Sequence, residues 1–126
     1  MHYIGKIDRN KIGEYGKKIT SEDVIITDER IEHIAEHHPD LELNDLKYMK
    51  MVLNEPEYIF KDRKNQNTIL LVKNIYENNK VYRMVIKLNT VSEKKNISNS
   101  IISFWSISKK KLNQYLRNEE ILYLKN

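Results

Sequence analysis

Residues 68–89 read TILLVKNIYENNKVYRMVIKLN, and this stretch carries the clearest signal of the fold. Two runs rich in β-branched and aromatic residues lie on either side of Asn78 and Asn79, a pair that favours a tight turn. Side chains alternate across a strand, so Arg83 and Lys87 share one face of the second run while its apolar residues share the other. The stretch therefore predicts a β-hairpin with one cationic face.

Weaker patterns on both sides of the hairpin complete the expected fold. The predicted elements are short extended pieces at 3–7 and 24–26, helices at 27–38, 44–53 and 109–117, strands at 58–60, 68–76, 81–89 and 100–107, and an apolar tail at 121–124. Helices precede a run of strands, which predicts an α+β fold: N-terminal helices packed on a four-stranded antiparallel sheet, a meander, with a C-terminal helix. Residues 1–126 are expected to form a single domain, with residues 1–23 as an N-terminal arm.

The composition narrows the classes of function. The chain has no cysteine, which excludes disulfides, thiolate metal sites and cysteine nucleophiles. No stretch resembles a membrane span or a secretory leader, so a cytoplasmic protein is expected. The net charge is +4, and lysines gather at 94–95 and 109–111, which favours a polyanionic partner such as RNA. The alternative is a chain-wide excess of lysine, asparagine and isoleucine with no role in binding.

Three of the four histidines, His33, His37 and His38, fall in one short predicted helix, whose start Thr27 or Asp28 can cap. Imidazole is the side chain best suited to moving protons near neutral pH, so the segment predicts acid–base chemistry. At helical spacing His38 continues the apolar stripe and is expected to point inward as a buried histidine. His33 and His37 then lie one turn apart on a neighbouring, solvated flank.

The strand at 100–107 adds a second group of residues. Ser103 and Trp105 lie two residues apart and therefore on one face of that strand. A hydroxyl beside the chain's only tryptophan, on the same exposed face of the sheet as Arg83 and Lys87, suits a phosphate with a base stacked next to it. Ordinary packing is the alternative, because large aromatic side chains are mostly buried. The residues expected to face the helices instead are Met84, Ile86, Ile102 and Phe104.

Two motifs resemble a known group of nucleases. They are Thr-x-x-x-Ile-x-His-Ile-x-x-x-His-Pro at 27–39 and Asn-Ser-Ile-Ile-Ser-Phe-Trp at 99–105. Both resemble the phage- and toxin-associated BECR nucleases, which unite barnase, EndoU, colicin and RelE type ribonucleases, and the chain looks closest to the phage-borne branch. The resemblance covers residues 24–117 and implies a BECR-like nuclease domain with metal-independent endoribonuclease activity.

The resemblance also implies where the active site lies. It places the site on the exposed sheet beside a helix-borne histidine, which would be His33 or His38. The strand cations would be Arg83 and Lys87. The Ser-x-Trp pair of colicin D-like tRNases is matched by Ser103 and Trp105. A toxin or mobile-element ribonuclease of this kind would act on an RNA such as tRNA, and an acidic antitoxin or immunity protein would block its basic site.

Metal-free cleavage of RNA needs one group to take the 2′-hydroxyl proton, another to protonate the leaving 5′-oxygen, and cations to stabilise the phosphorane. The product would carry a 2′,3′-cyclic phosphate, and no metal or cofactor is expected. The assigned roles are His33 as leading acid or base, His37 as its partner, His38 as a further candidate, Arg83 and Lys87 as cations, Ser103 as a phosphate donor, and Trp105, Ser106, Lys109 and Lys110 as substrate-binding residues. Glu36 is the carboxylate placed to act as the base instead.

Two other classes of function remain open at this level. His33-Ile34-Ala35-Glu36-His37 matches the inverted zincin pattern, in which two histidines one turn apart hold zinc and the glutamate activates water. A motif of five residues matches easily by chance, and no companion motif supplies a third ligand. The other class is a non-catalytic basic module that binds RNA or a partner protein.

Overall fold

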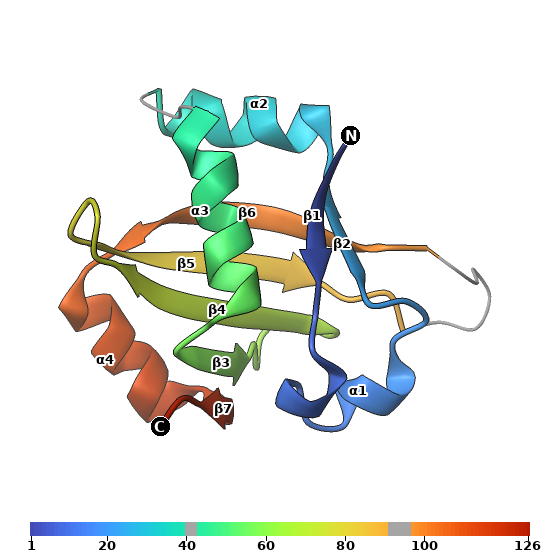
Figure 1. The fold of residues 1–126 in the computed structure, drawn as a ribbon. Helices are drawn as coiled ribbons and strands as arrows, with labels where there is room; N and C mark the ends of the chain where they lie inside the picture. The colour runs from blue at the N-terminus through green and yellow to red at the C-terminus, as the bar shows by residue number, and fades with distance from the viewer. Residues whose placement is uncertain (40–42, 91–96) are drawn as a thin grey trace.

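The computed structural model describes residues 1–39, 43–90 and 97–126, and its strands form one sheet in the order β1-β2-β6-β5-β4-β3-β7 (Figure 1). The strands are β1 His2–Lys6, β2 Asp23–Ile26, β3 Tyr58–Lys61, β4 Thr68–Ile75, β5 Lys80–Lys87, β6 Asn99–Ile107 and β7 Glu120–Leu124. The helices are α1 Tyr15–Lys18, α2 Asp28–His37, α3 Leu43–Asn54 and α4 Lys109–Asn118, with a 3-10 turn, η1, at Arg9–Lys11. In the described residues no helix has both the length and the apolar character that crossing a bilayer requires.

The sheet has seven strands in the described part of the chain and is mixed, so the predicted four-stranded antiparallel meander is wrong. Neighbouring strands are antiparallel except β2 and β6, which run parallel with Val24 opposite Asn99. Strand β1 precedes the helices, and the expected apolar tail forms the edge strand β7. The sequence predicted extended pieces at 3–7 and 24–26 but did not assign them, or the tail, to the sheet, because β1, β2 and β7 are four or five residues long and their partners lie far away in sequence.

The hairpin of β4 and β5 is confirmed. The two strands pair from Thr68 opposite Lys87 to Ile75 opposite Lys80. In the turn Asn79 takes a φ of 57°, a left-handed conformation that asparagine tolerates better than most residues. The alternation predicted for β5 therefore holds, and its two sets of side chains point to opposite faces of the sheet.

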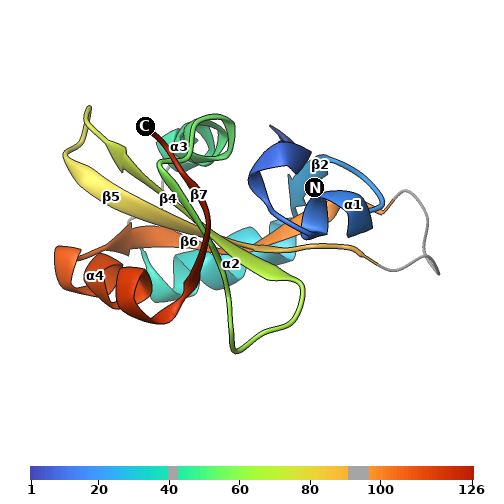
Figure 2. The same cartoon turned by 90° about the horizontal axis from the view of Figure 1, so that it is seen from below.

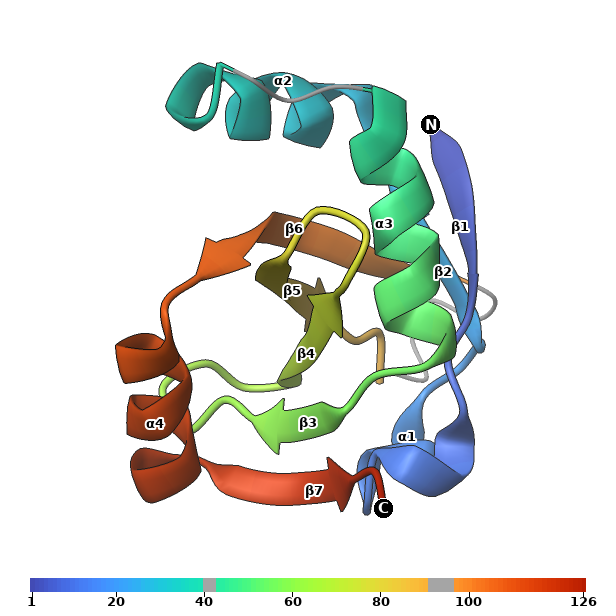
Figure 3. The same cartoon turned by 60° about the vertical axis from the view of Figure 1, so that its left-hand side comes forward.

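Two apolar cores lie on the two faces of the sheet, with α3 on one side and α4 on the other (Figure 2). The larger, which we call the main core, packs α3 against the strands and also receives Ile34 of α2. The smaller core lies under α4, and its buried members are Phe60, Leu70, Val72, Val85 and Tyr115. Figure 3 shows α3 lying across the curved sheet, with α2 near β6 and α4 near β3 and β7. The sheet thus has an α3 face and an α4 face.

The N-terminal segment, residues 1–23, belongs to the sheet and the main core. Its buried apolar side chains are Ile4, Ile7, Ile12, Tyr15 and Ile19. Asn99 of β6, fully buried, donates from Nδ2 to the carbonyls of Ser21 (2.8 Å) and Asp23 (3.0 Å), and its Oδ1 accepts from the Asn89 amide at 2.9 Å. These bonds satisfy a buried amide completely and hold the segment against β6.

Helix α2 begins as the sequence predicts, with Thr27 Oγ1 accepting from the Arg30 amide at 3.1 Å. Strand β2 pairs with β6 only at Asn99 and Ser100, and the chain then turns into α2. Helix α2 runs beside the remaining length of β6 (Figure 1). This arrangement brings the end of the histidine helix to the strand that carries Ser103 and Trp105.

Candidate functional site

Arg83 of β5 is the centre of the candidate site. It is half-buried, and its guanidinium donates from Nη1 to the Tyr115 hydroxyl (2.9 Å) and from Nη2 to the Ser103 hydroxyl (3.1 Å). Its Nε is buried without a hydrogen-bond partner. None of the described carboxylates forms an ion pair with it. A partly desolvated cation without a counter-charge is unfavourable, and an anion bound beside the guanidinium would relieve it.

Trp105 of β6 lies directly opposite Arg83 in the strand pairing. Its ring stacks on the imidazole of His38, with centroids 4.0 Å apart and planes 20° from parallel, and both side chains are half-exposed. The prediction that His38 points into the core is wrong, because α2 ends at His37 and His38 leaves the helix with φ −136°. The turn after α2 instead places the imidazole of His38 on Trp105, the residue paired with Arg83.

A β-bulge in β6 decides which side chains share the face with Arg83. The pairing shifts between Val85 opposite Ser103 and Ile86 opposite Ile101, so that Ile102 is the extra residue. As a result Ile101 joins the main core, whereas Ile102 packs on the α4 face, contrary to the alternation expected from the sequence. Ser103 keeps its predicted face, toward Arg83.

The start of α4 adds positive charge beside this group. Lys109, Lys110 and Lys111 are exposed in the first turn, and Ser108 Oγ caps the helix by accepting from the Lys111 amide at 3.1 Å. Cations at a helix N-terminus oppose the helix dipole, so three lysines there are unfavourable unless an anion binds nearby. The Lys111 ammonium lies 5.3 Å from the ring centroid of Tyr115, which links these lysines to Arg83.

Arg83, Ser103, Trp105, His38, Tyr115 and Lys111 are together called the Arg83 cluster below. It offers hydroxyl and cationic donors for a phosphate, a half-exposed indole for stacking, and an imidazole for proton transfer.

Two of the predicted histidines are not part of the cluster. His33 and His37 are exposed on α2, where their rings meet edge to face with centroids 4.9 Å apart. Glu36 is exposed on the same helix. In the described residues no three histidine, aspartate or glutamate side chains are placed to hold a metal ion together.

Lys87 and Ser106, two further residues predicted for the site, lie outside the Arg83 cluster. Lys87 has its ammonium on the Gln66 carbonyl at 2.8 Å, at the far end of β5 from the turn. Ser106 lies opposite Tyr82, a residue of the main core, and so points away from the face of Trp105. The lysines at 94–95 fall in 91–96, outside the described residues.

At the start of α2, the Asp28 carboxyl is perturbed by two neighbouring groups at the N-terminus of the chain. The N-terminal ammonium, 2.9 Å from Asp28, lowers the pKa of that carboxyl, and His2 at 3.0 Å lowers it further. Asp28 starts the helix whose other end carries His38. Its negative charge therefore interacts favourably with the dipole of α2, and Asp28 is not part of the Arg83 cluster.

Sequence reasoning missed Tyr115. It is 8% exposed in the smaller core, where it packs with Leu112 and Leu116 of the same helix. Helical spacing gave the signal that these side chains share one face, but not that the hydroxyl reaches Arg83 on a strand.

Residues 30–126 match a family model described as the phage MuF C-terminal domain. No curated protein and no solved structure matches the chain.

Proposed function

The chain belongs to the phage MuF C-terminal domain family, and from this premise we propose that it is a phage-borne endoribonuclease that cleaves RNA without a metal ion. The observation that carries the proposal is the half-buried Arg83, which has two hydroxyl partners, an unsatisfied Nε and no carboxylate partner among the described residues. The resemblance of the histidine segment and of the Ser-x-Trp strand to BECR-type ribonucleases supports the same chemistry. The likeness of Ser103 and Trp105 to the Ser-x-Trp pair of colicin D-like tRNases favours tRNA as the substrate.

In the proposed reaction Arg83 binds the scissile phosphate and stabilises the charge that develops on its oxygens. Ser103 donates a second hydrogen bond to the same group. The Tyr115 hydroxyl accepts from Arg83 at 2.9 Å, so its own proton remains available for a phosphate oxygen or for the leaving 5′-oxygen. Lysines of the first turn of α4 bind flanking phosphates.

His38 takes the leading acid–base role in this proposal, in place of His33. Its ring is fixed against Trp105 at 4.0 Å, whereas His33 touches His37 on the outer side of α2. A general base must be positioned before its proton affinity matters. His38 removes the proton from the 2′-hydroxyl, the 2′-oxygen attacks phosphorus, and the bond from phosphorus to the 5′-oxygen breaks as the Tyr115 hydroxyl donates its proton to the leaving 5′-oxygen, which gives a 2′,3′-cyclic phosphate. The exposed part of Trp105 stacks on a neighbouring base.

The decisive experiment is cleavage of RNA in EDTA by the wild type and by two matched variants, His38→Ala and His33→Ala. We expect His38→Ala to lower the rate by about two to four decades, the usual contribution of a positioned acid or base, and His33→Ala to leave it within about threefold. End analysis of the products should find 2′,3′-cyclic phosphates. His38→Ala should also remove the limb of the pH–rate profile that a histidine contributes.

The outcomes separate the alternatives. RNA binding without cleavage by the folded wild type would favour the non-catalytic binding module. Peptide hydrolysis that requires zinc and is lost in His33→Ala would favour the inverted zincin. Equal loss of RNA cleavage in both variants would refute the assignment to His38. A small acidic partner that abolishes cleavage would fit the proposed antitoxin or immunity protein.

A further inference from the structure

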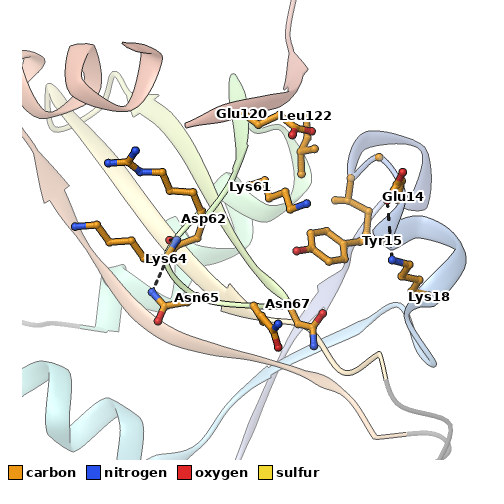
Figure 4. Close-up of a pocket in the computed structure, with 14 residues that line it drawn as sticks. Glu14, Tyr15, Lys18, Lys61, Asp62, Lys64, Asn65, Asn67, Glu120 and Leu122 are labelled. Carbon is orange, nitrogen blue, oxygen red and sulfur yellow. Dashed lines mark hydrogen bonds and ion pairs between the residues drawn. The ribbon is translucent and has the colours of Figure 1, made fainter. Parts of the chain in front are cut away.

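A pocket elsewhere in the molecule shares no lining residue with the Arg83 cluster (Figure 4). It has a volume of about 580 Å³ and lies between the segment of η1 and α1 and the connection of β3 to β4, residues 62–67, with β7 as a third wall. We call it the β3–β4 pocket. Its volume falls in the range of small-molecule sites, which hold ligands of nucleotide size.

Lys61, which lines the β3–β4 pocket, forms no ion pair with any of the described carboxylates. Lys61 is half-buried, and its ammonium lies 5.7 Å from the ring centroid of Tyr15, which supplies only a weak counter-charge. Two of the three acids among the described residues that line the pocket are engaged: Glu14 pairs with Lys18 at 4.0 Å, and Asp62 accepts from the Lys64 amide at 2.9 Å. The third, Glu120, lies opposite Lys61 in the pairing of β3 with β7 but is not within ion-pair distance of it. Against these three acids, the described lining carries four basic side chains, Lys18, Lys61, Arg63 and Lys64.

Neutral donors converge on the same space. The Tyr15 hydroxyl points toward the connection of β3 to β4 (Figure 4). The side chains of Gln66 and Asn67 line the pocket as well. A phosphate with several oxygens can accept from one lysine and from amide and hydroxyl groups together.

The wall formed by residues 62–67 is held in place before any ligand binds. The Gln66 carbonyl accepts from the Lys87 ammonium (2.8 Å) and from the Thr68 hydroxyl (2.9 Å). Asn67 has a φ of 54°, and its carbonyl accepts from the Leu88 amide at 2.7 Å. A preformed wall lowers the entropy cost of binding.

We propose that the β3–β4 pocket binds the phosphate group of a nucleotide-sized ligand through Lys61, with Tyr15 and the amide side chains as neutral donors. The phosphate belongs either to a free nucleotide or to one nucleotide unit of an RNA strand. This binding does not depend on cleavage at the Arg83 cluster.

The test is an NMR titration of the ¹⁵N-labelled chain with adenosine 5′-monophosphate, with adenosine as the uncharged control. We expect the nucleotide, but not adenosine, to shift the amides of Tyr15 and of residues 61–67. Lys61→Gln should weaken this binding about tenfold, the contribution of one hydrogen bond to a charged group. Lys11→Gln is the matched control, since that lysine also lies over a tyrosine ring, Tyr123 at 4.8 Å, but does not line the pocket. It should bind as the wild type does.

A short oligoribonucleotide distinguishes the two sources of the phosphate. Shifts with the mononucleotide alone support a free nucleotide, whereas shifts that appear only with the oligonucleotide and vanish in Lys61→Gln support an RNA strand. If Lys61→Gln loses its dispersed spectrum, the exposed Lys64→Gln replaces it. No shifts at the pocket with either ligand, equal binding of adenosine, or equal affinities of the Lys61→Gln and Lys11→Gln variants would overturn the proposal. In Arg83→Gln the shifts at the pocket should persist, so failure of the proposed function and failure of this inference are distinguishable.

Discussion

Replacing Arg83 by methionine should stabilise the protein while removing the affinity of the Arg83 cluster for phosphate. Methionine keeps the length of the stem but removes the buried Nε, which has no partner, and the charge, which has no counter-ion among the described residues. Such an unsatisfied buried group costs about 1–3 kcal/mol. The two hydrogen bonds that are lost join Arg83 to the hydroxyls of Ser103 and Tyr115, and both hydroxyls are acceptors in these bonds, so each keeps its own proton for another hydrogen bond. We therefore expect a gain of about 1 kcal/mol in the free energy of unfolding, or a rise of about 3–5 °C in Tm.

Arg9 provides the matched control for this prediction. It is also half-buried, but its guanidinium donates to the carbonyls of Gly16 (2.7 Å) and Ile19 (3.2 Å) and pairs with Glu22 at 3.3 Å. Arg9→Met leaves these acceptors without their donor and should cost about 2–3 kcal/mol. The two variants should thus move in opposite directions from the wild type.

The assay is urea denaturation followed by circular dichroism, with and without inorganic phosphate. Phosphate should stabilise the wild type and Arg9→Met by mass action, and should stabilise Arg83→Met less, since that variant keeps only the β3–β4 pocket as a proposed phosphate site. If Arg83→Met destabilises the protein as much as Arg9→Met does, Arg83 is a structural residue, and the reasoning from its unsatisfied Nε fails.

Three further predictions concern RNA binding and the frame of the site. Trp105→Ala should weaken binding of single-stranded RNA by about 1–3 kcal/mol, measured by fluorescence anisotropy with a labelled oligonucleotide, and an unchanged affinity would contradict the stacking role. Removing the charges of Lys109 and Lys110 together should reduce the slope of log K against log salt by about 1.4, because each contacted phosphate contributes about 0.7; an unchanged slope would place the RNA elsewhere. Asn99→Ala removes three hydrogen bonds, to the part-buried carbonyls of Ser21 and Asp23 and to the Asn89 amide, and should cost about 3 kcal/mol in urea denaturation; a loss below about 1 kcal/mol would show that Asn99 does not hold the N-terminal segment against β6.

Local physics decided which parts of the fold could be predicted. The hairpin of β4 and β5 is recognisable because its strands are adjacent in sequence and its turn contains Asn79. The start of α2 follows from Thr27, whose cap needs only the next turn of chain. By contrast, the partner of Val24 in β2 is Asn99, and the sequence of a four-residue strand does not predict which distant strand it will pair with.

The candidate site was predictable in its strands and not in its helices. Ser103 and Arg83 meet because alternation along two strands is a strong rule, even though the extra Ile102 changes the face of its neighbours. The position of His38 depends on how the chain leaves α2. Extending the apolar stripe of the helix by one residue predicted that the His38 side chain points into the core, whereas it stacks on Trp105. The Tyr115 contact needs the placement of α4 over the sheet, which only tertiary packing determines.

The pairing of β2 with β6 also has a consequence for how the protein is made. During synthesis β2 can pair with β1, and β3 with β4, but the pairing of Val24 with Asn99 and that of Ile59 with Tyr123 must wait until β6 and β7 have been synthesised. Such long-range pairings raise the contact order and slow folding, because large loops have to close first. The apolar side chains of β2, Val24 and Ile26, stay uncovered during that interval and are exposed to aggregation. For the proposed nuclease the same delay would be protective, since Arg83 and Trp105 meet only after β6 has been synthesised and has joined β5.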